Sequence, residues 1–403
     1  MKNSNIVELF QPAHTLIGNG SIGEIPRFMG SVGVKRALVV TDEGLVKLGT
    51  VKLVTDVLDN NNVPYVVYDK VEPNPSVRIV NEAYKAYKDS GADFLVAIGG
   101  GSPIDVAKAV SVLATNGGDI RDYEGVAKSQ KPGAPIVAIN TTAGTGSEVT
   151  RAYVVTDEEK KIKMVMVDNN CMAYLAIDDP SLMVGMPPAL TAATGMDALT
   201  HAVEAFLSNA HTPFSDGAAI EAIRLVSKSL KRATHFGRDI QARTDMCWAE
   251  YLAGLAFSNS GLGLVHAIAH QLGGFYHTPH GVANAILLPF VMEYNAPYRT
   301  KRVARIGQAW FDAETEGVSD DESAKLAIEK IRTLSREIGI PYLCDTPFDM
   351  KDIPILAENA LKDACAANNY VTATKQDIED ILMNAYVAGV VEKVKSAIEE
   401  ENK

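Results

Sequence analysis

Four of the chain's eight histidines lie within fifteen residues of one another, in a segment with helical spacing. His266 and His270 are four residues apart, so both project from one face of a helix, and Asp197 and His201 repeat that spacing. A Thr-Pro dipeptide before His280 is expected to end the helix and return the chain, which lets His280 face the helical pair. Isolated histidines on apolar helices are mostly core residues, but this clustering favours a metal site. A carboxylate with imidazoles suits Fe²⁺ or Zn²⁺ better than Ca²⁺ or Cu⁺. Spacing alone leaves open which three or four of these side chains are ligands.

Two loops of small residues in the first half are candidates for binding the phosphates of a dinucleotide. The first, Gly99–Ser102, lies between the apolar stretch 94–98 and a predicted helix. Glycines let backbone N–H groups approach a phosphate, and a helix N-terminus adds partial positive charge. The second, 141–148 (TTAGTGSE), follows the apolar stretch 136–140. Two such loops at the carboxyl ends of neighbouring strands would place a ligand where open α/β sheets bind them, although Gly99–Ser102 is also compatible with a simple strand–helix turn.

Gly18–Gly23 matches the dinucleotide motif GxGxxG, but we interpret it as a turn because the strand before it is short. Asp42 follows the apolar stretch 36–41. A carboxylate at that place accepts hydrogen bonds from a ribose 2′-hydroxyl and repels a 2′-phosphate, which favours NAD over NADP. Aspartate is also a common helix N-cap, so both interpretations of Asp42 stay open.

The elements that must position these residues change character at Pro187–Pro188. Before that pair, predicted strands at 36–41, 64–68, 94–98 and 136–140 alternate with predicted helices at 44–60, 77–88 and 104–114. This alternation predicts right-handed βαβ units and a parallel sheet. After the pair the pattern is almost entirely helical, with segments at 191–207, 216–233, 242–257 and 263–272. We therefore expect an α/β, Rossmann-like dinucleotide-binding domain at 1–187 and an all-α metal-binding domain at 188–403.

Length and composition narrow the class of protein. A chain of 403 residues exceeds the usual size of one domain. Its net charge of −12 disfavours nucleic acid and anionic membranes as partners. No apolar run approaches the roughly 20 residues of a membrane span, and no signal peptide is apparent. Four scattered cysteines argue against a disulfide framework and fit a reducing cytoplasm.

Together these segments resemble the iron-containing (group III) alcohol dehydrogenase family over essentially the whole chain. The resemblance is carried by GGGSP at 99–103, TTAGTGSEVTR at 141–151, ATGMDALTHAVEA at 193–205 and GLVHAIAHQLGGFYHTPHGVANAILLP at 263–289. It implies an N-terminal dinucleotide-binding domain and a C-terminal helical domain, with the active site in the cleft between them. It also implies a homo-oligomer, a dimer or larger.

The resemblance assigns roles to individual residues of this sequence. The metal ligands of the family fall on Asp197, His201, His266 and His280. His270 matches a histidine that lies near the metal, and we take it as the candidate for the proton path or for orienting a ligand. The family's NAD contacts, and one residue near the cofactor, Leu182, fall on Asp42, Asn74, Gly99, Gly100, Gly101, Ser102, Asp105, Thr141, Thr142, Thr145, Lys163 and Leu182. The chain departs from the family pattern at Ile104, His277, 258–260 and 368–370, none of which is a predicted ligand.

The predicted activity is a metal-dependent, NAD(H)-linked interconversion of a small primary alcohol or diol and its aldehyde by direct hydride transfer. Fe²⁺ is the expected metal, with Zn²⁺ or another divalent ion as alternatives. A reductase of a short aldehyde with a polar or anionic tail stays open. In a different class, a metal-dependent hydrolase also stays open, because Asp–His clusters activate water, but it leaves the glycine loops unexplained.

Overall fold

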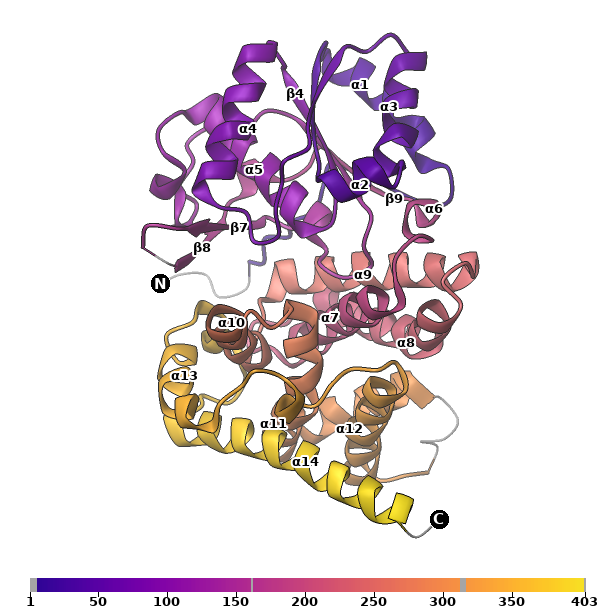
Figure 1. Cartoon of the computed structure of the whole chain (residues 1–403), viewed down its shortest axis with the longest axis vertical. Coiled ribbons are helices and arrows are strands. Elements are labelled where there is room, and N and C mark those ends of the chain that lie inside the picture. The colour runs from indigo at the N-terminus through magenta and orange to yellow at the C-terminus, as the bar shows by residue number, and fades with distance from the viewer. Residues whose placement is uncertain (1–5, 161, 312–316, 402–403) are drawn as a thin grey trace. The chain divides into compact units, whose positions relative to one another are not determined.

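The computed structural model describes residues 6–160, 162–311 and 317–401. The chain divides into two compact units, Met1–Gly185 and Met186–Lys403 (Figure 1). The predicted domain boundary after Pro187 falls beside this division. The first unit is built on a parallel sheet with helices, and the second is helical, as the sequence pattern predicts.

A six-stranded sheet forms the centre of the first unit. Its spatial order is β1 (His14–Ile17), β9 (Leu175–Asp178), β6 (Ile136–Asn140), β4 (Phe94–Gly99), β2 (Ala37–Val40) and β3 (Tyr65–Tyr68). All five neighbouring pairs are parallel. Strands β2, β4, β6 and β9 are buried along their whole length, which is why they consist of nearly continuous apolar residues rather than an alternating pattern.

Helices cover both faces of this sheet. They are α1 (Ile25–Val32), α2 (Glu43–Lys47), α3 (Thr50–Asn60), α4 (Val77–Ser90), α5 (Gly101–Asn116) and α6 (Pro180–Met183). The prediction of one helix over 44–60 is wrong. Gly49 adopts a left-handed φ of 78° between α2 and α3, so the first helix ends and a new one begins.

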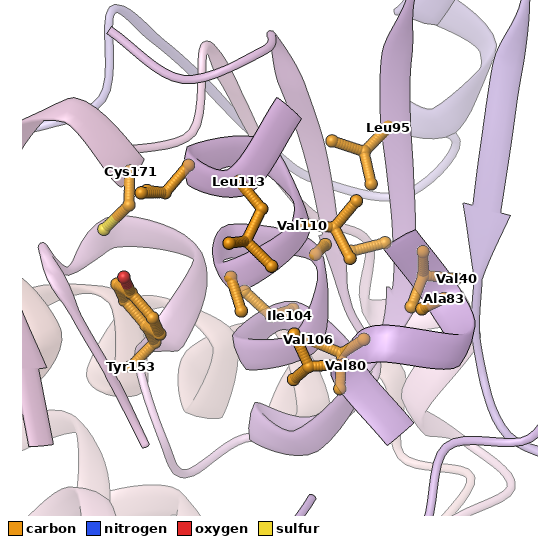
Figure 2. Close-up of a cluster of buried hydrophobic side chains, with 14 of the residues drawn as sticks. Val40, Val80, Ala83, Leu95, Ile104, Val106, Val110, Leu113, Tyr153 and Cys171 are labelled. Carbon is orange, nitrogen blue, oxygen red and sulfur yellow. The ribbon is translucent and has the colours of Figure 1, made fainter. Parts of the chain in front are cut away.

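Two apolar cores lie against the sheet, one on each side. In the first, Ile104 and Val110 of α5 pack among the strand residues Val40 and Leu95 (Figure 2). The second core joins residues of α1 and α3, such as Phe28 and Val54, to the strands and to Leu182 of α6. Burial on both faces fixes the strands, and with them the loops at their carboxyl ends.

A small second sheet in the same unit was not predicted. It has the order β5 (Gly125–Val126), β8 (Ile162–Val167) and β7 (Ala152–Asp157), with β7 and β8 antiparallel. In β7 every second residue is buried and the others are partly buried, and in β8 only Met164 and Met166 are buried, so these strands carry a weaker apolar signal than a central strand.

In its described residues the second unit is helical and has no strand. Its α-helices are α7 (Pro188–Leu207), α8 (Pro213–His235), α9 (Ile240–Ser260), α10 (Leu264–Tyr276), α11 (His280–Phe311), α12 (Asp320–Glu337), α13 (Ile353–Ala360) and α14 (Lys375–Glu401). Pro188 occupies the first position of α7, where the missing N–H costs no hydrogen bond. Within the described ranges no single helix has the length and apolarity of a membrane span; only α9 and α10 together, bent by 103° at their junction, reach them.

Candidate active site

Three helices of the second unit bring the four predicted ligands together. Asp197 and His201 lie one turn apart in the buried centre of α7. His266 lies in the first turn of α10, and His280 is the first residue of α11. The chain reverses between α10 and α11 because His277 adopts a left-handed φ of 55° and ends α10, as the Thr-Pro dipeptide predicts.

The ligand atoms of these four residues converge. Asp197 Oδ1 lies 3.9 Å from Nε2 of His201, 3.9 Å from Nε2 of His266 and 3.6 Å from Nε2 of His280. One ligand atom from each residue falls within 4.8 Å of all the others. Ligands that share one ion at roughly 2.0–2.2 Å lie about 3–4 Å from each other, so the donor set fits a single divalent cation.

Asn284, which the sequence analysis missed, gives independent support for that fit. Its Nδ2 donates to Asp197 Oδ1 at 2.7 Å and lies 3.1 Å from His266 Nε2 and 3.2 Å from His280 Nε2. A group that carries partial positive charge is thus surrounded by three acceptor atoms. Its own Oδ1 is buried and has no hydrogen-bond partner among the described residues. The lone pairs of the cluster therefore point at a common position.

The protonation of the cluster also suits a cation. Burial alone would raise the pKa of Asp197, but His201, His280, His266 and the hydrogen bond from Asn284 lower it below its ordinary value. Burial lowers the pKa of His266 well below its ordinary value. The site thus offers a carboxylate and a neutral imidazole, the forms that bind a metal.

His270 lies beside this cluster rather than in it. Its ring stacks on that of His280 with 5.5 Å between centroids. Its Nδ1 is 2.8 Å from Oδ2 of Asp363, on the segment before the short helix Ala364–Asn368. A proton held on Nδ1 by this carboxylate leaves Nε2 as the atom of His270 that is open to exchange.

Gly281 allows His280 to approach α7. A Cβ atom on Gly281 would lie 2.2 Å from the carbonyl oxygen of Ala193 and 2.7 Å from its carbon. We expect Gly281→Ala to push the start of α11 away from α7 and to weaken metal affinity by roughly 10-fold or more, a loss typical of disturbed ligand geometry. Competition with a chromophoric chelator measures this. Gly274→Ala is the matched control, since its Cβ would meet nothing within 4 Å. Equal affinities in the two variants would contradict the prediction.

In the first unit, the order of the strands reverses between β2 and β4. From β2 the chain proceeds outward to β3, whereas β4, β6 and β9 follow one another in the opposite direction. Ligands of open α/β sheets bind outside the carboxyl ends of the strands at such a reversal. Asp42 follows β2 there, and Gly99 ends β4.

The two predicted phosphate loops pack against each other at this edge. A Cβ atom on Gly100 would lie 3.0 Å from Oγ1 of Thr142, and one on Gly101 would lie 3.4 Å from Cγ2 of Thr145. The backbone N–H of Thr141 donates to the carbonyl of Gly99 at 3.0 Å. Helix α5 begins here without a side-chain cap, so its first N–H groups are available to an anion.

The other residues predicted to contact the cofactor differ in burial and in hydrogen-bond partners. Asn74 and Lys163 lie together, with Lys163 Nζ donating to Asn74 Oδ1 at 2.8 Å. Asp42 accepts from the N–H of Leu45 at 2.9 Å and caps α2, which is one of the two roles that its sequence position suggested. Leu182 is buried in the second core. Ser102 is half-buried in the first turn of α5.

Asp105 is tied to its own unit through both carboxylate oxygens. Oδ1 accepts from the hydroxyl of Ser147 at 2.8 Å, and Oδ2 accepts from the N–H of Val154 at 3.1 Å. These bonds fasten α5 to the second loop at Ser147 and to β7 at Val154.

Comparison with known proteins agrees with this arrangement. The iron-containing alcohol dehydrogenase model matches residues 12–180, and the C-terminal model of the Fe-containing alcohol dehydrogenase family matches residues 191–386. The chain belongs to the iron-containing alcohol dehydrogenase family. It is therefore a metal-dependent, NAD-linked oxidoreductase of alcohols and aldehydes.

Several known dehydrogenases are similar to this chain over nearly its whole length. Alcohol dehydrogenase 4 of Saccharomyces cerevisiae is 45% identical over 386 residues, covering 95% of this chain and 99% of that protein. NAD-dependent methanol dehydrogenase of Bacillus methanolicus is 41% identical, covering 94% of this chain and all of its own length. A crystal structure of a 1,3-propanediol oxidoreductase superposes with a TM-score of 0.93 at 43% identity, covering 94% of this chain and 100% of that chain.

Proposed function

We propose that this enzyme interconverts a small primary alcohol or diol and its aldehyde at a divalent metal held by Asp197, His201, His266 and His280, with NAD(H) as the hydride carrier. The observation that carries the proposal is the convergence of one carboxylate and three imidazoles within 4.8 Å. The similarity to alcohol, methanol and propanediol dehydrogenases supports a small substrate. Membership of a dehydrogenase family disfavours the hydrolase alternative.

When bound, the metal supplies Lewis-acid polarisation of the substrate's oxygen, and the nicotinamide supplies or accepts the hydride. The chain's own residues hold and orient both groups. Asp197 contributes the negative charge of the ligand set, and Asn284 fixes its carboxylate with a 2.7 Å hydrogen bond. Buried surroundings keep His266 neutral, with its lone pair available.

The cofactor is assigned to the edge of the sheet where Asp42 follows β2 and Gly99 ends the neighbouring strand β4. We propose that Gly99, Gly100, Gly101 and Ser102, with Thr141, Thr142 and Thr145, hold the pyrophosphate through backbone N–H groups and hydroxyls. Asn74 and Lys163 are assigned to the same cofactor. Asp105 is assigned to the cofactor as well: each of its oxygens accepts one hydrogen bond, from Ser147 and from Val154, and keeps a second lone pair.

Asp42 is expected to select NAD. Asp42→Gly should relax the preference for NADH over NADPH, because the carboxylate that repels a 2′-phosphate is lost. Glycine is itself an acceptable N-cap, so stability should fall by only about a few tenths of a kcal/mol. The ratio of kcat/KM for the two cofactors measures the effect. Asp239→Gly, at the N-cap of α9, makes the same change in the other unit and should leave the ratio unaltered. An unchanged ratio in Asp42→Gly would leave Asp42 as a cap alone.

His270 is expected to move the proton between the substrate and solvent through Nε2, with Asp363 holding the proton on Nδ1. His270→Ala should lower kcat by roughly 10²-fold or more, as is usual for loss of a proton-transfer group. Added imidazole should restore part of the lost activity. Wild-type turnover at every pH would show that His270 has no such role.

The proposed activity can be tested by removing the metal with a chelator and restoring Fe²⁺ or Zn²⁺, then following NADH oxidation with a panel of short aldehydes. We expect activity to disappear and to return with one of the ions. Activity that is indifferent to both treatments would contradict the proposal. The panel should include aldehydes with a polar or anionic tail, since these distinguish the alternative substrate class.

We also propose Fe²⁺ as the native metal, a cytoplasmic location and a homo-oligomeric assembly. The family to which the chain belongs supports iron. The four cysteines are free, which suits a reducing compartment. Metal analysis of the purified enzyme and its mass in solution test the first and the last of these.

A further inference from the structure

Glu204 is a buried carboxylate that none of the steps above uses. Glu204 lies on α7, three residues after His201, and only 5% of its surface is exposed. Three nitrogen atoms lie within hydrogen-bond distance of its carboxylate oxygens. The N–H of Gly263 donates to Oε2 at 3.0 Å, the N–H of Val265 donates to Oε1 at 2.6 Å, and Nδ1 of His266 lies 2.6 Å from Oε2.

The start of α10 explains why a carboxylate from another helix reaches this place. Gly263 is the N-cap of α10 and has no side chain with which to cap the helix. The first N–H groups of α10 have no partner within the helix and are buried, so acceptors from elsewhere in the chain must satisfy them. Glu204 satisfies the N–H groups of Gly263 and Val265, and Oδ1 of Asn369 accepts from that of Leu264 at 3.4 Å.

Glycine at position 263 also leaves room for this approach. A Cβ atom there would lie 3.0 Å from Oε1 of Glu204 and 3.1 Å from Oδ1 of Asn369. The carboxylate can therefore contact the Nδ1 edge of the His266 imidazole, away from the Nε2 atom that faces the metal cluster. Nδ1 faces Glu204, while Nε2 faces Asp197.

We propose that Glu204 is a positioning residue for the metal site: its carboxylate accepts the Nδ1 proton of His266, which fixes the tautomer whose Nε2 lone pair points at Asp197 and the metal. This inference rests on the proposed metal binding by His266. Metal-binding histidines commonly donate their second N–H to a carboxylate, which orients the ring and raises its basicity. Glu204 does so while capping the helix that carries the same histidine, so ring orientation and backbone position are set by one group.

A competing arrangement has the opposite proton position. Burial raises the pKa of Glu204 to about 7. A protonated Glu204 would donate to Nδ1 of His266 and place the imidazole proton on Nε2, where it blocks a metal. The two arrangements differ in one observable, the nitrogen of His266 that carries the proton.

Nitrogen-15 NMR of the metal-free wild-type protein, labelled at histidine, measures that proton directly. The His266 signals are assigned by their loss in His266→Asn. We expect the proton on Nδ1. A proton on Nε2 at neutral pH would overturn the proposal, and this measurement requires no variant of Glu204 to fold.

Metal affinity gives the second test. In Glu204→Gln, the amide oxygen can accept from the backbone, while the NH₂ group faces Nδ1 and favours the wrong tautomer. We expect binding of Zn²⁺, measured by competition with a chromophoric chelator, to weaken by roughly 10–100-fold. Asn369→Ala is the matched control, since Asn369 caps the same helix without touching His266. It should bind Zn²⁺ within about twofold of wild type.

The affinity measurements distinguish a failure of the proposed role of Glu204 from a failure of the proposed metal site. An affinity of Glu204→Gln within about twofold of wild type would refute the role of Glu204. An equal loss in Asn369→Ala would also refute it, because capping alone would then explain the effect. Failure of the proposed function looks different, since the wild-type protein would then bind no metal.

Discussion

Asp197→Ala is expected to abolish metal binding and to lower kcat/KM for aldehyde reduction by about 10³-fold or more, because the Lewis acid that the reaction requires is lost. Asp197 is the central residue of the cluster: its Oδ1 lies within 3.9 Å of Nε2 of all three histidines. It is also the only carboxylate among the four. Without it, a divalent cation would meet three neutral imidazoles and no compensating charge.

Two measurements separate a lost metal from a lost fold. Metal content per chain should fall to near zero, whereas NADH affinity, measured by fluorescence titration, should stay close to wild type, because the proposed cofactor residues lie in the other unit. Asp245→Ala is the control. It removes a buried carboxylate of α9 that is bound to Ser229 and Lys228 rather than to the cluster, so the metal should be retained. An Asp197→Ala enzyme with one metal per chain and normal turnover would refute the assignment.

Lys108→Met is expected to give the largest loss of stability in the first unit. Lys108 is a fully buried residue of α5. Its Nζ donates to the backbone carbonyls of Ser147 at 2.6 Å, Thr150 at 2.9 Å and Ala152 at 2.7 Å. Burial lowers the pKa of Lys108 below its ordinary value. Both the charged and the neutral form of its side chain carry N–H groups that can donate to these carbonyls. Methionine fills the same space without a donor.

Thr150 still donates to the carbonyls of Ser147 and Ala152, so the loss is that of three hydrogen bonds rather than of every partner. At about 1–2 kcal/mol for each bond, we expect the free energy of unfolding to fall by about 3–6 kcal/mol. Urea unfolding measures this. The KM for NADH should also rise, because the segment 147–152 includes the end of the second phosphate loop, 141–148. Lys52→Met, which removes an exposed ammonium paired with Asp56, should leave stability nearly unchanged. Wild-type stability in Lys108→Met would mean that water replaces the ammonium.

The fold was predictable where a signal is local. The stretches 94–98 and 136–140 are buried on both faces of the sheet. Their residues are therefore continuously apolar, and this pattern predicts strands β4 and β6. Strand β9 has only four residues and takes its place between β1 and β6 by long-range pairing. The prediction of one helix over 44–60 was wrong because the spacing of apolar residues gives no sign of the left-handed backbone at Gly49.

The same distinction holds for the site. Asp197 and His201 are placed together by helical spacing alone, and the return of the chain to His280 follows from the Thr-Pro turn. Glu204 and Asn284 were missed because their partners are distant: 62 residues separate Glu204 from His266, and 87 separate Asn284 from Asp197. No pattern within one helix records such contacts.

The most direct test of the central claim is a crystal structure of the enzyme reconstituted with Fe²⁺ or Zn²⁺, with anomalous scattering recorded at the absorption edge of the metal. We predict one peak in each chain, within bonding distance of Asp197 and of Nε2 of His201, His266 and His280. A catalytically active crystal form with no peak there, or with its peak at other residues, would contradict the account.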